Sequence, residues 1–365
     1  MNEREALIAL NMLPRIGPIR VRRLTAAFGS ASGVLAASAS RLRAVDGIGD
    51  DTAGIISRWE DHADLSGELA RTAERGIAII TPEDTSWPAA LRELPDAPLL
   101  LYVWGGIADR DRHALAVVGS RRTTHYGRQC AHKLSFQMAG AGYTIISGLA
   151  RGIDTAAHEG AVAARGRTIA VLGSGLGKLY PPENMPLAEH IADGHGAVVS
   201  EFPLLTPPDQ QTFPQRNRIV AGWCTGLLVV ECPSRSGALI TANLANEYGR
   251  QVFAVPGQID HPSSAGCNAL IRNGASLITD GQQILDDLSQ LPFQATAPAP
   301  ASKPPPELSP EEASVFNALG AEERPIDHIV DATGLPVGAV SATLLQLEMK
   351  KLAKQLPGHY YIRVS

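Results

Sequence analysis

The sequence predicts an α/β protein with a doubly wound, mostly parallel sheet at its centre, a helical domain before it and a winged-helix domain after it. Between residues 77 and 291, short runs rich in Val, Ile and Leu alternate with helical patterns, which is typical of successive right-handed βαβ units. At 365 residues the chain is longer than one ordinary domain. Shifts in composition divide it into residues 1–76, 77–291, 292–310 and 311–365.

The amino-terminal part has apolar residues at helical spacing, interrupted at Ile16-Gly17-Pro18 and at Gly47-Ile48-Gly49. Each interruption precedes a new helical run, which predicts two helix-hairpin-helix-like turns in a SAM/helix-hairpin-helix-like domain. Six arginines and no acidic residue lie between Pro14 and Val45. Such turns can direct backbone N–H groups at a nucleic-acid phosphate without reading the bases. The alternative is a helical bundle in which the glycines only shape the loops.

Several predicted strands of the core end in glycine, serine or arginine just before a helix. The carboxyl ends of parallel strands share one edge of a sheet, so these loops should converge there. Free N–H groups at helix starts attract anions, and arginine grips phosphate through two hydrogen bonds. A lone turn of this kind would be structural, but its repetition predicts a phosphate-binding rim. The segments are Gly119-Ser120-Arg121, Ser147-Gly148, Arg151-Gly152, Gly173-Ser174-Gly175, Ser236-Gly237 and, opening a helix, Phe213-Pro214-Gln215-Arg216-Asn217-Arg218.

Other function classes lack their sequence signals. The segment Gly173-Ser174-Gly175-Leu176-Gly177 does not have GxGxxG spacing, and no Walker lysine-serine pair occurs, so no nucleotide cofactor is expected. The cysteines form no CxxC pair and have no histidines at zinc-finger spacing, so we expect no metal. No apolar run approaches the roughly 18 to 20 residues of a membrane span, and residues 1–5 do not resemble a secretory signal. We therefore expect a cytoplasmic protein. The formal net charge of -5 argues only weakly against nucleic acid.

The carboxy-terminal part follows a Pro- and Ala-rich linker, residues 292–310. Helical patterns cover Glu311 to Leu319, Ile326 to Thr333 and Val337 to Leu352, and the tail alternates around Pro357-Gly358 as in a two-stranded wing. The third helix has few base-reading side chains apart from Gln346, and lysines gather at its far end. This composition favours protein contact or weak phosphate contact over sequence-specific reading.

Six motifs, in the same order as in the family, resemble those of the DNA-processing protein A family (DprA, also called Smf). The resemblance covers nearly the whole chain and implies an amino-terminal helical domain, an extended Rossmann-like core and a carboxy-terminal winged helix. The chain departs from the family in one loop, where Gly177 and Lys178 follow Leu176 and members commonly carry aspartate. The motifs are Val118-Gly119-Ser120-Arg121, residues 147–154 (SGLARGID), residues 213–222 (FPQRNRIVAG), residues 236–242 (SGALITA), residues 252–257 (VFAVPG) and residues 266–271 (GCNALI).

The resemblance implies binding of single-stranded DNA without sequence specificity, and loading of a RecA-type recombinase onto it during natural transformation. Single-strand-binding protein would be displaced or bypassed, the protein would be a homodimer, and no catalysis is implied. Phe213 and Tyr180 are candidate stacking platforms, unless they are packed core or loop residues. The candidate DNA- and phosphate-binding residues are Gly119, Ser120, Arg121, Ser147, Gly148, Arg151, Gly152, Lys178, Tyr180, Phe213, Arg216, Asn217, Arg218, Ser236 and Gly237.

Two constellations point to alternatives. Asp154 and His158, four apart on a predicted helix, could form an acid–base pair, although a helix N-cap and a surface histidine are the favoured interpretation. Ser236-Gly237 with Thr241 and Glu247 resembles the phosphoribohydrolases of nucleoside monophosphates, but the PGGxGTxxE loop of those enzymes is missing. A winged-helix transcription regulator with a ligand-sensing core is the third hypothesis.

Overall fold

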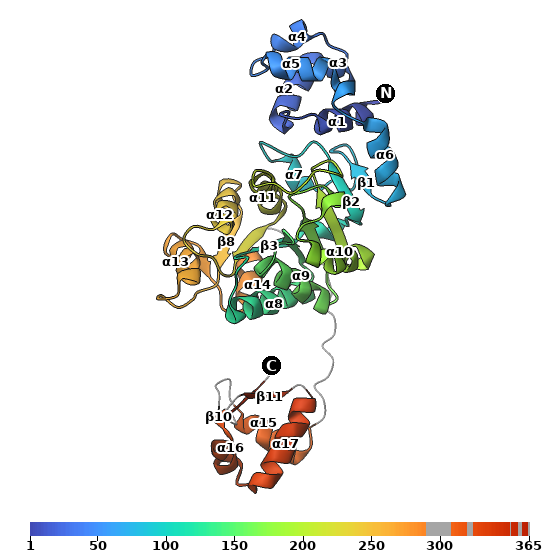
Figure 1. Cartoon of the computed structure of the whole chain (residues 1–365). Coiled ribbons are helices and arrows are strands. Elements are labelled where there is room, and N and C mark those ends of the chain that lie inside the picture. Colours follow the sequence, from blue (N-terminus) through green and yellow to red (C-terminus); the bar gives the residue numbers. More distant parts are fainter. Residues whose placement is uncertain (290–307, 320–323, 351, 357–359, 364–365) are drawn as a thin grey trace. The chain divides into compact units, whose positions relative to one another are not determined.

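The computed structural model describes residues 1–289, 308–319, 324–350, 352–356 and 360–363. The chain forms two compact units, residues 1–300 and 301–365 (Figure 1).

The first unit begins with a helical domain that has a hydrophobic core of its own. Its glycines lie where the sequence predicts turns, because Gly17 is the N-cap of α2 and Gly49 is the N-cap of α5. Leu10, Leu24 and Ile56 are completely buried between its helices. The helices are α1 (Glu3–Met12), α2 (Pro18–Phe28), α3 (Ala31–Leu35), α4 (Ala39–Arg43), α5 (Asp50–Ser57) and α6 (Leu65–Glu74).

A sheet with the strand order β1-β2-β6-β5-β4-β3-β7-β8-β9 forms the centre of the first unit. Strands β3 to β9 pair with one another in parallel, while the β1–β2 and β2–β6 pairs at one edge are antiparallel. The chain runs outward from β3 to β6, then returns to the other side of β3 as β7. The predicted doubly wound, mostly parallel sheet is confirmed, and its switch point lies between β3 and β7. The strands are β1 (Ala78–Ile80), β2 (Leu101–Gly105), β3 (Ala114–Val118), β4 (Thr144–Ser147), β5 (Thr168–Val171), β6 (Gly196–Ser200), β7 (Gly226–Val229), β8 (Gln251–Ala254) and β9 (Ser276–Leu277).

Helices cover both faces of this sheet (Figure 1). Alternate residues of β3 point to opposite faces, as the pleat requires. Leu115 and Val117 pack with α8, α9 and α14, whereas Ala116 and Val118 pack with α11, α12 and α13. The helices are α7 (Ala89–Arg92), α8 (His125–Gly140), α9 (Ile153–Ala163), α10 (Met185–His190), α11 (Thr212–Trp223), α12 (Gly237–Glu247), α13 (Ala265–Arg272) and α14 (Gly281–Ser289).

The second unit has the predicted winged-helix arrangement. Three helices, α15 (Pro310–Ala318), α16 (Ile326–Thr333) and α17 (Val337–Met349), pack around Val315, Ile329 and Leu344. The wing is a sheet in the order β10-β12-β11, formed by β10 (Arg324–Pro325), β11 (Ala353–Leu356) and β12 (Tyr360–Arg363). The predicted linker lies outside the described residues except for its last three.

Among the described residues, no single helix is long and apolar enough to cross a membrane. Only the pair Ile326–Thr333 and Val337–Glu348, bent by 109°, passes that test of length and composition.

Candidate nucleic-acid interface

A pocket of about 430 Å³ opens at the switch point of the sheet. It lies among the loops that follow β3, β4 and β7 and the first turns of α11, where an open α/β sheet places its ligands. The structure therefore brings together loops that are more than a hundred residues apart in sequence. The candidate residues that line it are Gly119, Ser120, Arg121, Phe213, Arg216, Asn217, Ser236 and Gly237.

Backbone hydrogen bonds join these loops directly. The Ser120 N–H donates to the Glu231 carbonyl oxygen at 2.6 Å, and the Ile153 N–H donates to the Ser120 carbonyl oxygen at 3.2 Å. Gly152 makes this approach possible, because its φ is +82° and a Cβ there would lie 2.3 Å from the Ser120 carbonyl oxygen. A larger residue at position 152 would be strained and would also push the two loops apart.

The carboxylate of Glu231 holds the loop after β3 in place through hydrogen bonds. It is 4% exposed and accepts hydrogen bonds from the Thr123 hydroxyl at 2.7 Å and from the Thr124 N–H at 3.0 Å. Burial raises the pKa of Glu231, but hydrogen bonds from Ser263, Thr123 and Thr124 outweigh that effect and hold the pKa below its ordinary value. Sequence reasoning assigned Glu231 no role. The available signal was a carboxylate directly after an apolar run.

Two aromatic rings between two guanidinium groups form a row that begins in the pocket and continues beside it, because Arg121 and Phe213 line the pocket and Tyr180 and Arg151 do not. The Arg121 guanidinium carbon lies 4.8 Å from the Phe213 ring centroid, and the Phe213 and Tyr180 centroids are 6.2 Å apart. The Arg151 guanidinium carbon then lies 5.6 Å from the Tyr180 centroid. Phe213 is half-buried over Gly173, where a Cβ would lie 2.7 Å from the ring. Neither ring is in a core cluster, and base stacking by Phe213 and Tyr180 stays a prediction.

Arg216 lies in the floor of the pocket and is 5% exposed. Its Nη1 donates to the Gly148 carbonyl oxygen at 2.6 Å and also to that of Val171. A Cβ on Gly148 would lie 2.4 Å from this guanidinium, so a larger residue there would displace the Arg216 side chain. Burial lowers the pKa of Arg216 to about 10, which still leaves it charged at neutral pH. Arg216 and Gly148 therefore support the pocket from below, as does Ser147, whose buried hydroxyl donates to the Val117 carbonyl oxygen.

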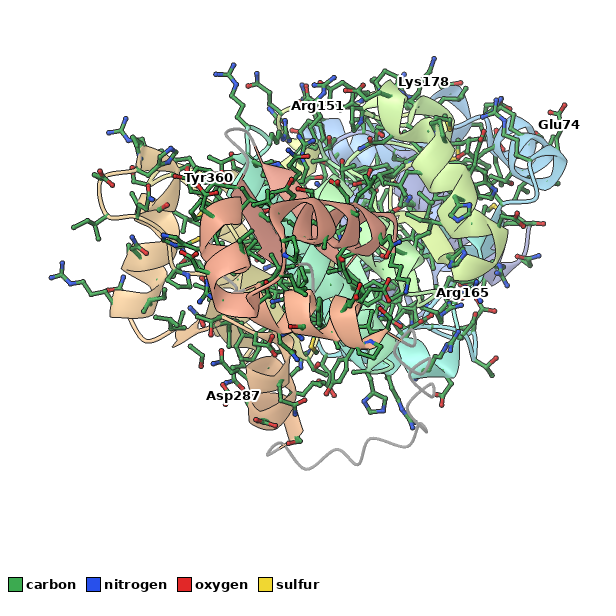
Figure 2. All side chains as sticks on the ribbon, turned by 90° about the horizontal axis from the view of Figure 1, so that it is seen from below. Glu74, Arg151, Arg165, Lys178, Asp287 and Tyr360 are labelled. Carbon is green, nitrogen blue, oxygen red and sulfur yellow. The ribbon has the colours of Figure 1, made fainter. Side chains whose placement is uncertain are left out.

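The structure does not bring every candidate to the pocket. Arg218 follows Arg216 by two residues, about 200° around the helix, and its guanidinium forms a buried ion pair with Glu201 on the other side of α11. Lys178, at the end of a short 3₁₀ turn, is exposed and does not line the pocket. Arg151 and Lys178 are labelled in Figure 2; both are exposed, and the Arg151 guanidinium forms an ion pair with Glu183.

The favoured interpretation of Asp154 and His158 was wrong. Gly152, not Asp154, is the N-cap of α9, and the Asp154 carboxylate accepts hydrogen bonds from the N–H groups of Gly148 and Ala150. His158 is completely buried rather than on the surface, because α9 is packed between α8 and the sheet. Its Nδ1 lies 2.6 Å from the Thr168 hydroxyl oxygen.

Sequence reasoning missed three further pocket residues, Gln210, Pro233 and Arg235, which lie in none of the motifs. Arg235 is exposed and directly precedes Ser236, whose hydroxyl caps α12. Its place in the loop after β7 was the signal that could have identified it. Within the described residues, no three His, Cys, Asp or Glu side chains gather as metal ligands would.

Known proteins resemble the chain along almost its whole length. Residues 78–289 match the model of the DNA recombination-mediator protein A family, and residues 298–359 match that of the DprA winged helix domain. Protein Smf of Synechocystis sp. is 34% identical, and the match covers 99% of each chain.

Two solved structures share the fold. DNA processing protein A from Streptococcus pneumoniae has a TM-score of 0.68 and 33% identity, covering 78% of this chain and 97% of that one. The protein of the same name from Helicobacter pylori, described for its single-stranded DNA binding mode, has a TM-score of 0.52 and 29% identity over 58% of this chain and 96% of its own. The chain therefore belongs to the DNA recombination-mediator protein A family, and its role is in DNA processing and recombination.

Proposed function

We propose that this chain binds single-stranded DNA without sequence specificity in the pocket at the switch point, and loads a RecA-type recombinase onto the strand during natural transformation. The observation that carries the DNA-binding part is a row of two rings between two guanidinium groups, which begins in the pocket with Arg121 and Phe213 and continues beside it with Tyr180 and Arg151. Guanidinium groups can follow the phosphates while exposed bases stack on the rings, whatever their identity. The similar Helicobacter pylori protein binds single-stranded DNA, which supports this assignment.

We propose that the chain acts as a cytoplasmic homodimer, takes over strands from single-strand-binding protein, and is not an enzyme. His158 supports the last point, since its hydrogen bond is used inside the core. Asp154 lines the pocket, but its carboxylate already accepts hydrogen bonds from the N–H groups of Gly148 and Ala150. The phosphoribohydrolase alternative is not favoured. Ser236 and Glu247 lie at opposite ends of α12, which is about 15 Å long, so they cannot serve one small ligand. The face of α17 that carries Ser341, Ala342 and Leu345 is exposed but offers little base-reading chemistry, which argues against a transcription regulator.

Arg121→Glu is expected to weaken binding of a mixed-sequence single strand about 100-fold, or roughly 2.7 kcal/mol. The change replaces a phosphate-binding cation with an anion beside Phe213. Fluorescence anisotropy over a salt series, with single-stranded and duplex oligonucleotides, measures the effect. Native affinity should fall with salt by about 0.7 log units per log unit for each phosphate neutralised.

Arg122→Glu is the matched control, because Arg122 is the adjacent exposed arginine and does not line the pocket. It should cost only a few-fold in affinity through long-range repulsion. Equal losses in the two variants, or no binding by the native chain, would remove the pocket from the proposal. The loading step is tested separately by following recombinase filament growth on strands already covered by single-strand-binding protein. Native chain should accelerate growth, and Arg121→Glu should not.

A further inference from the structure

A second pocket, of about 480 Å³, lies on the opposite side of α11 from the first. The helical domain contributes Gly17, Ile19, Arg20 and Arg23 from the start of α2, and the core contributes Gln215 and Arg218 from α11, with Asp96 and Glu201. All of these residues belong to the first unit of the chain.

Gly17 is not required by the fold at this place. Its φ is -97°, which any residue adopts, and a Cβ built on it would meet nothing within 4 Å. A Ser or Asp there would cap α2, which has no side-chain cap. Pro18 at the first helical position has no N–H, so glycine leaves the N–H groups of Ile19 and Arg20 open at the pocket.

The charge around Gly17 suits an anion. The first turn of α2 contains no acidic residue and carries Arg20, which is exposed. Gly49 has the same open, extended geometry at the start of α5, but Asp50 and Asp51 follow it and repel anions. The two glycine turns are therefore alike in shape and opposite in charge.

Arg218 supplies an independent observation, because it is 7% exposed and its Nη1 has no hydrogen-bond partner. Its Nη2 donates to Glu201, and its Nε lies 3.5 Å from Asp96. A buried guanidinium N–H without an acceptor is unfavourable, so an oxygen arriving in this pocket would stabilise it.

The two carboxylates of the pocket do not cancel its positive charge. Arg20, Arg23 and Arg218 face Asp96 and Glu201, and Arg22 lies behind them, bound to the carbonyl oxygens of Pro95 and Ala97. Arg23 also lies 3.6 Å from Asp46, but that pair is exposed and screened by solvent. The guanidinium groups therefore outnumber the carboxylates.

We propose that this second pocket binds a phosphate of the same single strand that occupies the first pocket, through the free N–H groups of α2, Arg20 and Arg218. This inference rests on the proposed function. Phe213 and Asn217 face the first pocket while Gln215 and Arg218 face the second, so a helix about 10–12 Å thick is all that separates them. The strand rounds the amino-terminal end of α11, and the helical domain extends the DNA site.

Gly17→Asp tests the proposal with Gly49→Asp as its matched control. Both changes add a capping carboxylate at an open helix start, so both variants should unfold at or above the native temperature. Anisotropy is measured with a short strand that fills only the first pocket and with a longer strand. Gly17→Asp should bind the longer strand about tenfold more weakly and lower its salt slope by about 0.7. It should bind the short strand normally, and Gly49→Asp should bind both like the native chain.

Arg20→Gln, an exposed change that removes one charge, should reproduce the weaker binding of the longer strand. Native-like binding of that strand by Gly17→Asp and Arg20→Gln would overturn the proposal. Loss of duplex binding alone would also overturn it, since the ligand would then be a duplex. Failure of the proposed function looks different, because the short strand would then bind equally to native chain and to Arg121→Glu.

Discussion

Arg216→Met is expected to lower the free energy of unfolding by about 2–5 kcal/mol, because each buried group left without its hydrogen-bond partner costs roughly 1–3 kcal/mol. The guanidinium is 5% exposed, and its removal leaves the carbonyl oxygens of Gly148 and Val171 without their donor. It also removes the main attraction that opposes the effect of burial on Asp154. Burial raises the pKa of Asp154, so this carboxylate would take up a proton more readily in the variant.

Urea unfolding followed by circular dichroism measures this effect. Arg235→Met is the matched control, because Arg235 lines the same pocket but is exposed, and its unfolding midpoint should stay native. The two variants distinguish a residue that stabilises the fold from one that contacts DNA. Arg216→Met should lower the free energy of unfolding, and Arg235→Met should lower only the affinity for DNA. A native unfolding midpoint for Arg216→Met would show that the buried guanidinium does not hold the loops together.

Acidification should destabilise the protein through His158, by about 1.4 kcal/mol per pH unit and about 5 kcal/mol over the whole window. The Thr168 hydroxyl donates its proton to the Ile145 carbonyl oxygen, so it accepts from the Nδ1–H of His158. Nε2 is then the site of protonation, and it is buried without a partner. Burial lowers the pKa of His158 from 6.5 to about 3. Between these values the unfolded chain binds a proton that the folded chain does not, so stability falls as the pH falls.

The measurement is the urea midpoint at a series of pH values from neutral to acidic. His158→Leu should show a shallower dependence than the native chain, because the variant has no imidazole to protonate on unfolding. His125→Leu, at an exposed histidine on α8, should follow the native curve. Parallel curves for native chain and His158→Leu would assign the acid sensitivity to carboxylates instead.

The sheet and the convergence of its loops could be predicted because both follow from repeated local patterns. An apolar run in the sequence predicts each strand of the core. The glycines after β3 and β4 indicate loops that approach one another closely, as Gly152 approaches Ser120. The repetition matters more than any single turn. Parallel strands have only one edge at which their carboxyl ends can meet.

The sequence did not predict toward which side of α11 each side chain points. Arg216 and Arg218 are on opposite sides by helical period, but α11 is buried on both sides, so its sequence shows no polar face to orient it. The surface position expected for His158 fails for a related reason. Ala156, Ala157, Gly160 and Ala161 surround it with small residues that let α9 pack tightly, and a Cβ on Gly160 would lie 2.3 Å from the His132 carbonyl oxygen of α8. This run of small residues was the available signal of close packing.

Under the proposed function, the hydrogen bonds of Ser120 bear on how quickly a DNA strand binds and dissociates. Its N–H, carbonyl and hydroxyl are engaged by Glu231, Ile153 and Arg122 before any ligand is present. The pocket is therefore already shaped, and little conformational freedom is lost when it fills. Capture is governed by encounter and electrostatic attraction, while residence time depends on how many contacts must break. Such a strand dissociates as its contacts with the pocket break one after another, and no conformational change of the protein is required.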